Sequence, residues 1–192
     1  MHDIKIDISR ATSEHVDAAH GITPEDLGGI ALRVKDCAAI LEQERKEGKY
    51  GFYDLYKAQE VFAEVKRETD RFSQFGYENL VILGIGGSAL GITALNTALN
   101  PPYYNLLDTE ARGGRPRLFV MDNIDPDTFA KMLEVCPPEK TLYNVISKSG
   151  GTAETMIQLL IAMEPLERAV GKEKVKDHLV VTTSPDVEGA PK

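Results

Sequence analysis

The sequence predicts an α/β protein: a three-layer α-β-α sandwich around a parallel sheet, preceded by a helical N-terminal extension. The main observation is that short apolar runs alternate with longer segments of helical periodicity. The first run, Leu80-Val81-Ile82-Leu83, is apolar throughout, as in a strand buried on both faces. Glycines follow the first and third runs, where a strand would turn into a helix. The expected strands are 79–83, 118–121, 142–146 and 178–183.

The chain is expected to divide into an N-terminal helical extension, 1–75, and a sheet domain, 76–192. In the extension, Thr23-Pro24-Glu25-Asp26 has the composition of a helix start, and helical spacing continues to about Lys46. A second helix is expected from Tyr53 to about Phe72.

Three other segments are expected to be irregular or incomplete. Residues 4–8 alternate apolar and charged side chains, as in a short edge strand or an extended arm. Residues 103–116 show no periodicity and are expected to form a surface loop. The chain stops directly after its fourth expected strand, so we expect further residues beyond Lys192 in the intact protein.

Composition excludes several classes of protein. With 42% hydrophobic residues and a net charge of −8, the chain is typical of an ordinary globular protein and unlike a nucleic-acid-binding one. It contains neither a signal-peptide pattern nor a window apolar enough for a membrane span, so a cytoplasmic location is expected. Cys37 and Cys136 lie far apart and are expected to be two buried thiols rather than a disulfide or a metal site.

The turn after the third strand has the composition of a phosphate cradle. Its hydroxyls, lysine and glycines precede a helix, where backbone N–H groups and the helix dipole favour an anion. The order of a Walker A loop is absent. The alternative is an ordinary helix N-cap with flexible glycines. The residues of this turn are Ser147, Lys148, Ser149, Gly150, Gly151 and Thr152.

The turn after the first strand permits a second interpretation. Gly84-x-Gly86-x-x-Ala89 satisfies a relaxed dinucleotide fingerprint, and Asp122 ends the second strand. However, Asp122 lies much further along than the roughly 20 residues that this fingerprint expects. A nucleophile elbow is excluded because Leu90 stands where its second glycine is required.

Together, the two turns resemble the glucose-6-phosphate isomerase family. The motifs are Gly84-Ile85-Gly86-Gly87-Ser88 and Ser147-Lys148-Ser149-Gly150-Gly151-Thr152. The resemblance implies a SIS fold, flavodoxin- or Rossmann-like, in which residues 147–152 bind the phosphate of a sugar phosphate and Gly87 and Ser88 lie beside the sugar. Gly151 departs from the family pattern, which usually has threonine there.

The resemblance also implies an activity and its requirements. The intact enzyme would interconvert glucose 6-phosphate and fructose 6-phosphate through an enediol, as a homodimer, with neither metal nor nucleotide cofactor. The family's catalytic Glu, His, Lys and Arg lie in a second SIS subdomain and a C-terminal segment, and no stretch here resembles them. We therefore expect no catalytic residue in this chain, and little or no activity from it alone.

The remaining ionisable residues are better explained without catalysis. Glu154 follows the cradle in the first turn of a helix, where an acid complements the dipole. His15, His20 and His178 lack the spacing of a metal site. Two other functions stay open: a non-catalytic SIS domain that senses a sugar phosphate, and a nucleotide-binding domain.

Overall fold

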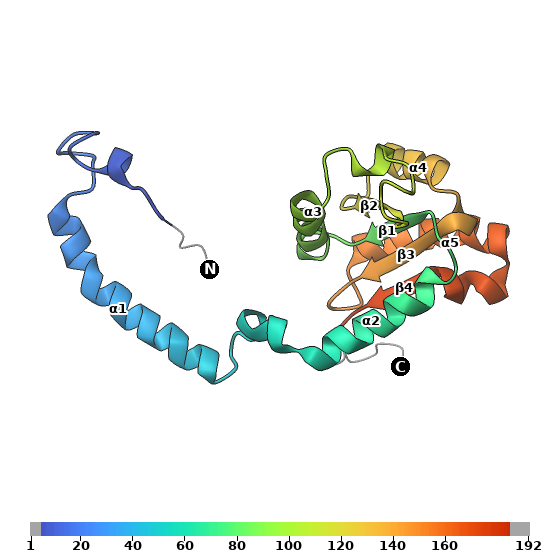
Figure 1. The fold of residues 1–192 in the computed structure, drawn as a ribbon, viewed down its shortest axis with the longest axis horizontal. Coiled ribbons are helices and arrows are strands. Elements are labelled where there is room, and N and C mark those ends of the chain that lie inside the picture. Colours follow the sequence, from blue (N-terminus) through green and yellow to red (C-terminus); the bar gives the residue numbers. More distant parts are fainter. Residues whose placement is uncertain (1–4, 185–192) are drawn as a thin grey trace. The chain divides into compact units, whose positions relative to one another are not determined.

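The computed structural model describes residues 5–184 (Figure 1). These residues divide into two compact units, with the boundary between Glu64 and Val65. Each unit is described here by itself. The boundary expected between residues 75 and 76 stays a prediction. The helices are α1 (Pro24–Lys46), α2 (Gln59–Ser73), α3 (Gly87–Leu99), α4 (Pro126–Val135) and α5 (Ala153–Val170). The strands are β1 (Asn79–Leu83), β2 (Arg117–Met121), β3 (Thr141–Ile146) and β4 (Leu179–Thr182).

The second unit contains a four-stranded sheet in which every neighbouring pair is parallel. The strand order is β2-β1-β3-β4, so β1 and β3 lie side by side in its centre. Leu83 pairs with Met121 on one side and with Val145 on the other. The carboxyl ends of β1, β2 and β3 therefore meet at one edge. The predicted α/β class and parallel sheet are confirmed.

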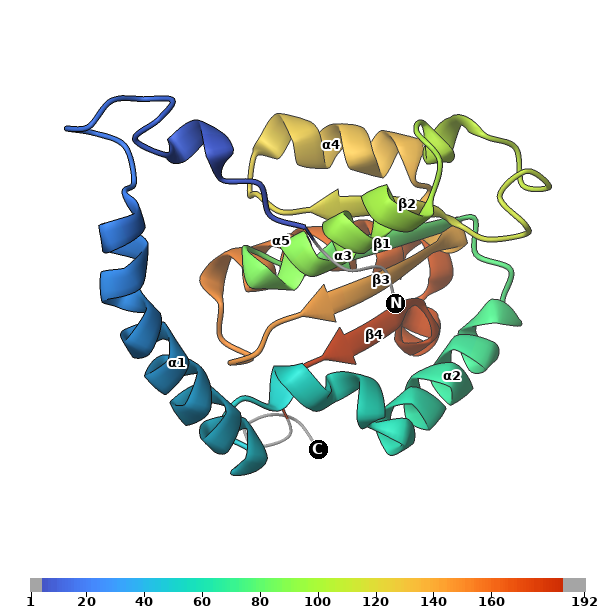
Figure 2. The ribbon, with the colours of Figure 1, turned by 60° about the vertical axis from the view of Figure 1, so that its left-hand side comes forward.

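Helices lie on both faces of the sheet, as right-handed crossovers require. Figure 2 shows α3 in front of the strands, whereas α4 and α5 supply the core on the other face. The core joins alternate residues of the central strands to apolar residues of these two helices. Its fully buried members include Val81, Leu83, Tyr143, Cys136 and Leu166. Burial raises the pKa of the Cys136 thiol to about 11, so it stays protonated at neutral pH.

The segment 103–116 is an irregular and largely exposed loop, as predicted, but it has internal order. It contains a 3-10 turn, Tyr104–Leu106, and it folds around the nearly buried Arg112. The guanidinium of Arg112 donates to the carbonyls of Leu107 and Arg115 and to the Thr109 hydroxyl. One arginine thus donates to several acceptors within this loop, and Asn105 joins the loop to β2 through two hydrogen bonds with the backbone of Leu118.

In the first unit, α1 begins as predicted. The Thr23 hydroxyl accepts a hydrogen bond from the Asp26 N–H at 3.1 Å, and the Asp26 carboxylate accepts one from the Thr23 N–H at 2.9 Å. This capping box lowers the pKa of Asp26. The described residues 5–8 form an irregular arm without strand structure. Cys37 is exposed, so the prediction that both cysteines are buried is wrong for Cys37.

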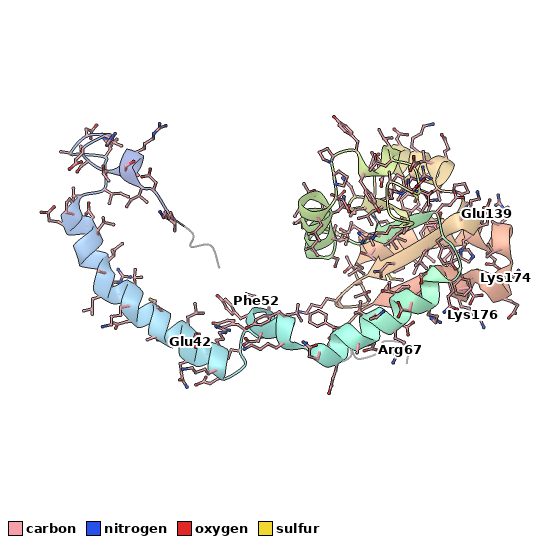
Figure 3. All side chains as sticks on the ribbon, in the orientation of Figure 1. Glu42, Phe52, Arg67, Glu139, Lys174 and Lys176 are labelled. Carbon is pink, nitrogen blue, oxygen red and sulfur yellow. The ribbon has the colours of Figure 1, made fainter. Side chains whose placement is uncertain are left out.

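The second predicted helix is only partly correct, because its first turns form a separate 3-10 segment, Gly51–Lys57. There the Asp54 carboxylate accepts from Arg45 at 2.9 Å and lies 2.7 Å from the Lys57 ammonium. Figure 3 marks Phe52, whose ring stacks on that of the following tyrosine with 4.4 Å between centroids. These contacts stabilise a tight turn before α2 begins. Among residues 5–184, no helix is both long enough and apolar enough to cross a membrane.

Candidate phosphate site at the sheet edge

The two glycine-containing turns lie at the same edge of the sheet. One follows β1 and the other follows β3, and these two strands are neighbours in register. Leu83, the last residue of β1, pairs with Val145, the next-to-last residue of β3. The sheet order therefore brings together two motifs that are about sixty residues apart in the sequence, at the edge where open α/β sheets bind ligands.

The turn after β3 gathers three hydroxyl groups, with that of Thr152 in the middle. The Ser147 hydroxyl donates to the Thr152 hydroxyl at 3.2 Å, and the Ser149 hydroxyl lies 3.5 Å from the same oxygen. Ser147 is 5% exposed and its N–H donates to the Thr182 carbonyl, which continues the ladder to β4. The position of Ser147 is therefore set by the sheet, and that of the other two hydroxyls by contact with each other.

The amino end of α5 has no side-chain cap. Thr152 occupies the N-cap position, but its hydroxyl accepts no hydrogen bond from the first turn of the helix. In α1, by contrast, the Thr23 hydroxyl accepts such a bond. Because the Thr152 hydroxyl interacts with Ser147 and Ser149, the first N–H groups of α5 stay available to an anion.

The other members of the turn shape its backbone and its charge. Lys148, Ser149, Gly150 and Gly151 are exposed. Gly150 has φ +68°, a left-handed conformation that favours glycine. A Cβ at Gly151 would meet no atom within 4 Å, so this position does not require glycine for lack of space. Lys148 supplies the only positive charge within residues 147–152, all of which the structure describes.

The turn after β1 packs against the end of β3. An ideal Cβ on the buried Gly84 would lie 2.9 Å from the Ser88 Cβ and 3.2 Å from the Ile146 carbonyl oxygen. Only glycine allows the two turns to approach this closely. Gly86 follows with φ +56° and reverses the chain into α3. Gly87 starts that helix, and the half-buried Ser88 lies one residue further on.

The structure thus brings together the predicted site residues, and their roles in binding stay predictions. Ser147, Lys148, Ser149, Gly150, Gly151 and Thr152 form one turn, and Gly87 and Ser88 belong to the neighbouring turn. Asp122 lies exposed just after β2 at the same edge.

Other ionisable groups lie away from this edge or on the outside of it. Glu154 is exposed in the first turn of α5. The His178 imidazole is buried beside β4 and interacts with the Thr141 carbonyl at 2.9 Å, at the amino ends of the strands. His20 forms a 3.0 Å contact with Asp17 in the first unit. Across residues 5–184, no group of three or more His, Cys, Asp or Glu side chains is arranged to hold a metal ion.

One buried polar residue near the site was missed by sequence reasoning. Gln158, on α5, is 1% exposed, and its carboxamide donates to the carbonyls of Met121 at 2.9 Å and Asn123 at 3.0 Å. The sequence signal was a single glutamine within the apolar stretch of that helix. A polar side chain on the buried stripe of a helix requires hydrogen-bond partners, and here they lie at the carboxyl end of β2.

The fold and the paired turns define an α/β protein whose ligand edge is built from a hydroxyl-rich turn and a glycine turn. Comparison with known proteins identifies its family. The model of the phosphoglucose isomerase family matches residues 58–189. The chain therefore belongs to the phosphoglucose isomerase family, and the resemblance noted from the two motifs is confirmed.

Individual relatives agree with this family. The glucose-6-phosphate isomerase of Carboxydothermus hydrogenoformans is 45% identical over 162 residues, covering 84% of this chain and 34% of the relative. That of Rubrobacter xylanophilus is 39% identical, covering 86% of this chain and 37% of the relative. The chain thus spans about a third of the length of the curated relatives that it matches.

Solved structures show the same fold. A hypothetical protein of Thermus thermophilus aligns with a TM-score of 0.68 and 33% identity, covering 86% of this chain and 37% of that one. A glucose-6-phosphate isomerase of Chlamydia trachomatis aligns with a TM-score of 0.50 and 29% identity, covering 66% of this chain and 23% of that one.

Proposed function

We propose that this chain supplies the phosphate-binding part of a glucose-6-phosphate isomerase. The intact enzyme would interconvert glucose 6-phosphate and fructose 6-phosphate. In this proposal the turn 147–152 binds the phosphate, and Gly87 and Ser88 lie beside the sugar. Supporting it are the family membership and the names of the relatives, which are glucose-6-phosphate isomerases. The homodimer and the cytoplasmic location also stay predictions.

The observation that carries the proposal is the arrangement of donors at the start of α5. Two serine hydroxyls lie within 3.5 Å of the Thr152 hydroxyl, the helix lacks a side-chain cap, and Lys148 adds a positive charge. A phosphate dianion accepts several hydrogen bonds at once and is stabilised by the helix dipole. A neutral ligand would gain much less from the dipole and the lysine than an anion does.

Aldose–ketose isomerisation also needs groups that this chain does not provide at the site. A base must move a proton between C2 and C1, and cations must stabilise the enediolate oxygen. Two exposed carboxylates follow strands at this edge: Glu154 complements the dipole of α5, and Asp122 follows the outer strand β2. Asp122 belongs to neither turn, and Glu154 has a role in its own helix, so we expect the catalytic groups outside this chain.

The 192-residue chain alone is accordingly expected to show little or no isomerase activity. The measurement is a coupled assay that follows glucose 6-phosphate formed from fructose 6-phosphate, with an active isomerase as a positive control. Rapid turnover by the purified chain would contradict the assignment of the catalytic groups to another part of the enzyme.

Binding separates the proposed function from its two alternatives. Calorimetry with fructose 6-phosphate should give a signal, and NAD should give none, if the edge is a sugar-phosphate site rather than a nucleotide site. A sugar-phosphate sensor would bind in the same way but would have no isomerase activity in its intact form. The assay of the intact protein therefore distinguishes sensor from enzyme.

Ser88 is expected to contribute to the sugar contact rather than to the phosphate contact. Replacing it with alanine should weaken binding of fructose 6-phosphate by about threefold to tenfold, the loss of one hydrogen bond. Inorganic phosphate should bind as before. Equal weakening of both ligands in paired titrations would place Ser88 in the phosphate site instead.

A further inference from the structure

The two turns of the site are joined by a hydrogen-bond connection that runs through one backbone carbonyl. The Met121 carbonyl, at the end of β2, accepts from the Gly84 N–H at 3.4 Å and from the Gln158 carboxamide at 2.9 Å. Gly84 begins the turn that carries Gly87 and Ser88. Gln158 belongs to α5, whose amino end is the hydroxyl-rich turn. A single oxygen thus accepts from the first residue of one turn and from the helix that follows the other turn.

Gln158 adds a second bond that fixes its orientation. Its carboxamide nitrogen also donates to the Asn123 carbonyl at 3.0 Å, two residues beyond Met121. The side chain is 1% exposed, and its Oε1 atom has no hydrogen-bond partner among the described residues. The two hydrogen bonds donated by the carboxamide nitrogen therefore fix the orientation of the amide. If the amide were flipped, its oxygen would face two backbone carbonyl oxygens at a position away from water.

Distance along the helix places this connection close to the ligand edge. Gln158 is six residues after Thr152, so it lies about 9 Å along α5 at 1.5 Å per residue. It joins α5 to β2, which is two strands away from β3 in the sheet. α5 is joined to the sheet by the turn after β3 and by apolar packing in the core. Gln158 adds hydrogen bonds from α5 to the end of β2.

From this geometry we propose that Gln158 is a positioning residue that sets the spacing between the phosphate turn, 147–152, and the sugar-side turn, 84–88. This inference rests on the proposed function. The affinity for a ligand that touches only the phosphate turn does not depend on this spacing. The affinity for a ligand that spans both turns does depend on it, since a displacement of about 1 Å is enough to weaken several hydrogen bonds at once.

The test compares two probes, inorganic phosphate and fructose 6-phosphate, by calorimetry on the 192-residue chain. The variant is Gln158→Met, which keeps the length of the side chain and removes both donors. We expect it to weaken fructose 6-phosphate binding by about tenfold and to change phosphate binding by less than about twofold. The ratio of the two affinities is the readout, because a loss of folded protein lowers both alike.

The matched control is Asn79→Leu. Asn79 is a fully buried amide too, but it lies at the amino ends of the strands, where it donates to Thr141 and accepts from Arg117. This change should lower the melting temperature and leave the ratio of affinities unchanged. If Gln158→Met does not fold, Gln158→Asn serves instead, since its shorter side chain keeps the amide but cannot reach both carbonyls.

The outcomes are distinct. If the unaltered chain binds neither phosphate nor fructose 6-phosphate, the proposed function is overturned, and the role of Gln158 with it. Binding of both probes by the unaltered chain, with the same ratio of affinities in Gln158→Met or in its substitute, overturns the positioning role alone. A ratio that changes as much in Asn79→Leu as in the Gln158 variant also overturns it.

Discussion

Replacing Gly84 with alanine is expected to lower the free energy of unfolding by about 1–3 kcal/mol, the usual cost of overpacking a buried position. The added methyl carbon would lie 2.9 Å from the Ser88 Cβ and 3.2 Å from the Ile146 carbonyl oxygen. The first neighbour is at the start of α3 and the second is strand backbone, so neither can move away as the end of a flexible side chain does. The turn and the end of β3 must separate.

This separation should also impair binding, because Gly84 lies where the two turns of the site meet. We expect Gly84→Ala to weaken fructose 6-phosphate binding at least about tenfold in a folded sample. Urea unfolding followed by circular dichroism measures the stability, and calorimetry below the unfolding transition measures the binding.

Gly91→Ala is the matched control. Gly91 lies in α3, is exposed, and would place its Cβ within 4 Å of nothing. Alanine there should stabilise the chain by up to about 1 kcal/mol, the difference in helix propensity. If Gly84→Ala and Gly91→Ala behave alike, the close approach of the two turns is not what requires glycine at position 84.

Replacing Lys148 with alanine is expected to weaken phosphate and sugar-phosphate binding by roughly tenfold to a hundredfold, the range for a hydrogen bond assisted by charge. Lys148 is exposed and lies in the turn before the uncapped amino end of α5. Because the ammonium is exposed, salt should reduce its contribution. Titrations at low and at physiological ionic strength should therefore show a smaller difference between variant and unaltered chain at the higher salt.

Two further variants make this result specific. Lys148→Arg retains the charge and should recover much of the affinity, while the stability of all variants should be nearly unchanged. Lys131→Ala removes an exposed lysine from α4, where it pairs with Glu134, and should have no effect on binding. Equal weakening by Lys131→Ala and Lys148→Ala would mean that net charge, rather than the cradle, attracts the anion.

The elements that were predicted correctly are those whose signals are local. β1 has the predicted bounds, Asn79–Leu83, because an unbroken apolar run buried on both faces leaves little ambiguity. α1 begins where Thr23-Pro24 indicated, because capping depends on residues within one turn. These predictions required no knowledge of the rest of the chain.

The sequence patterns missed features that depend on contacts of polar side chains. The residues before α2 have helical spacing, yet they form a 3-10 segment held by contacts of Asp54 with Arg45 and Lys57. The segment 103–116 is the loop that its lack of periodicity predicts, but the pattern gave no sign that this loop folds around Arg112. In both segments, the backbone conformation depends on a polar side chain whose partners lie several residues away. The periodicity of the sequence contains no information about such contacts.

The sequence by itself determined the two turns, their residue types and the strands that precede them, because glycine, proline and apolar runs act through local backbone chemistry. Only the tertiary structure decided that these turns touch. The strand order places β1 beside β3, Gly84 packs on Ile146, and Gln158 reaches the carbonyl that also pairs with Gly84. The physical reason is that contacts between segments far apart in sequence depend on sheet order and close packing, which no single segment encodes.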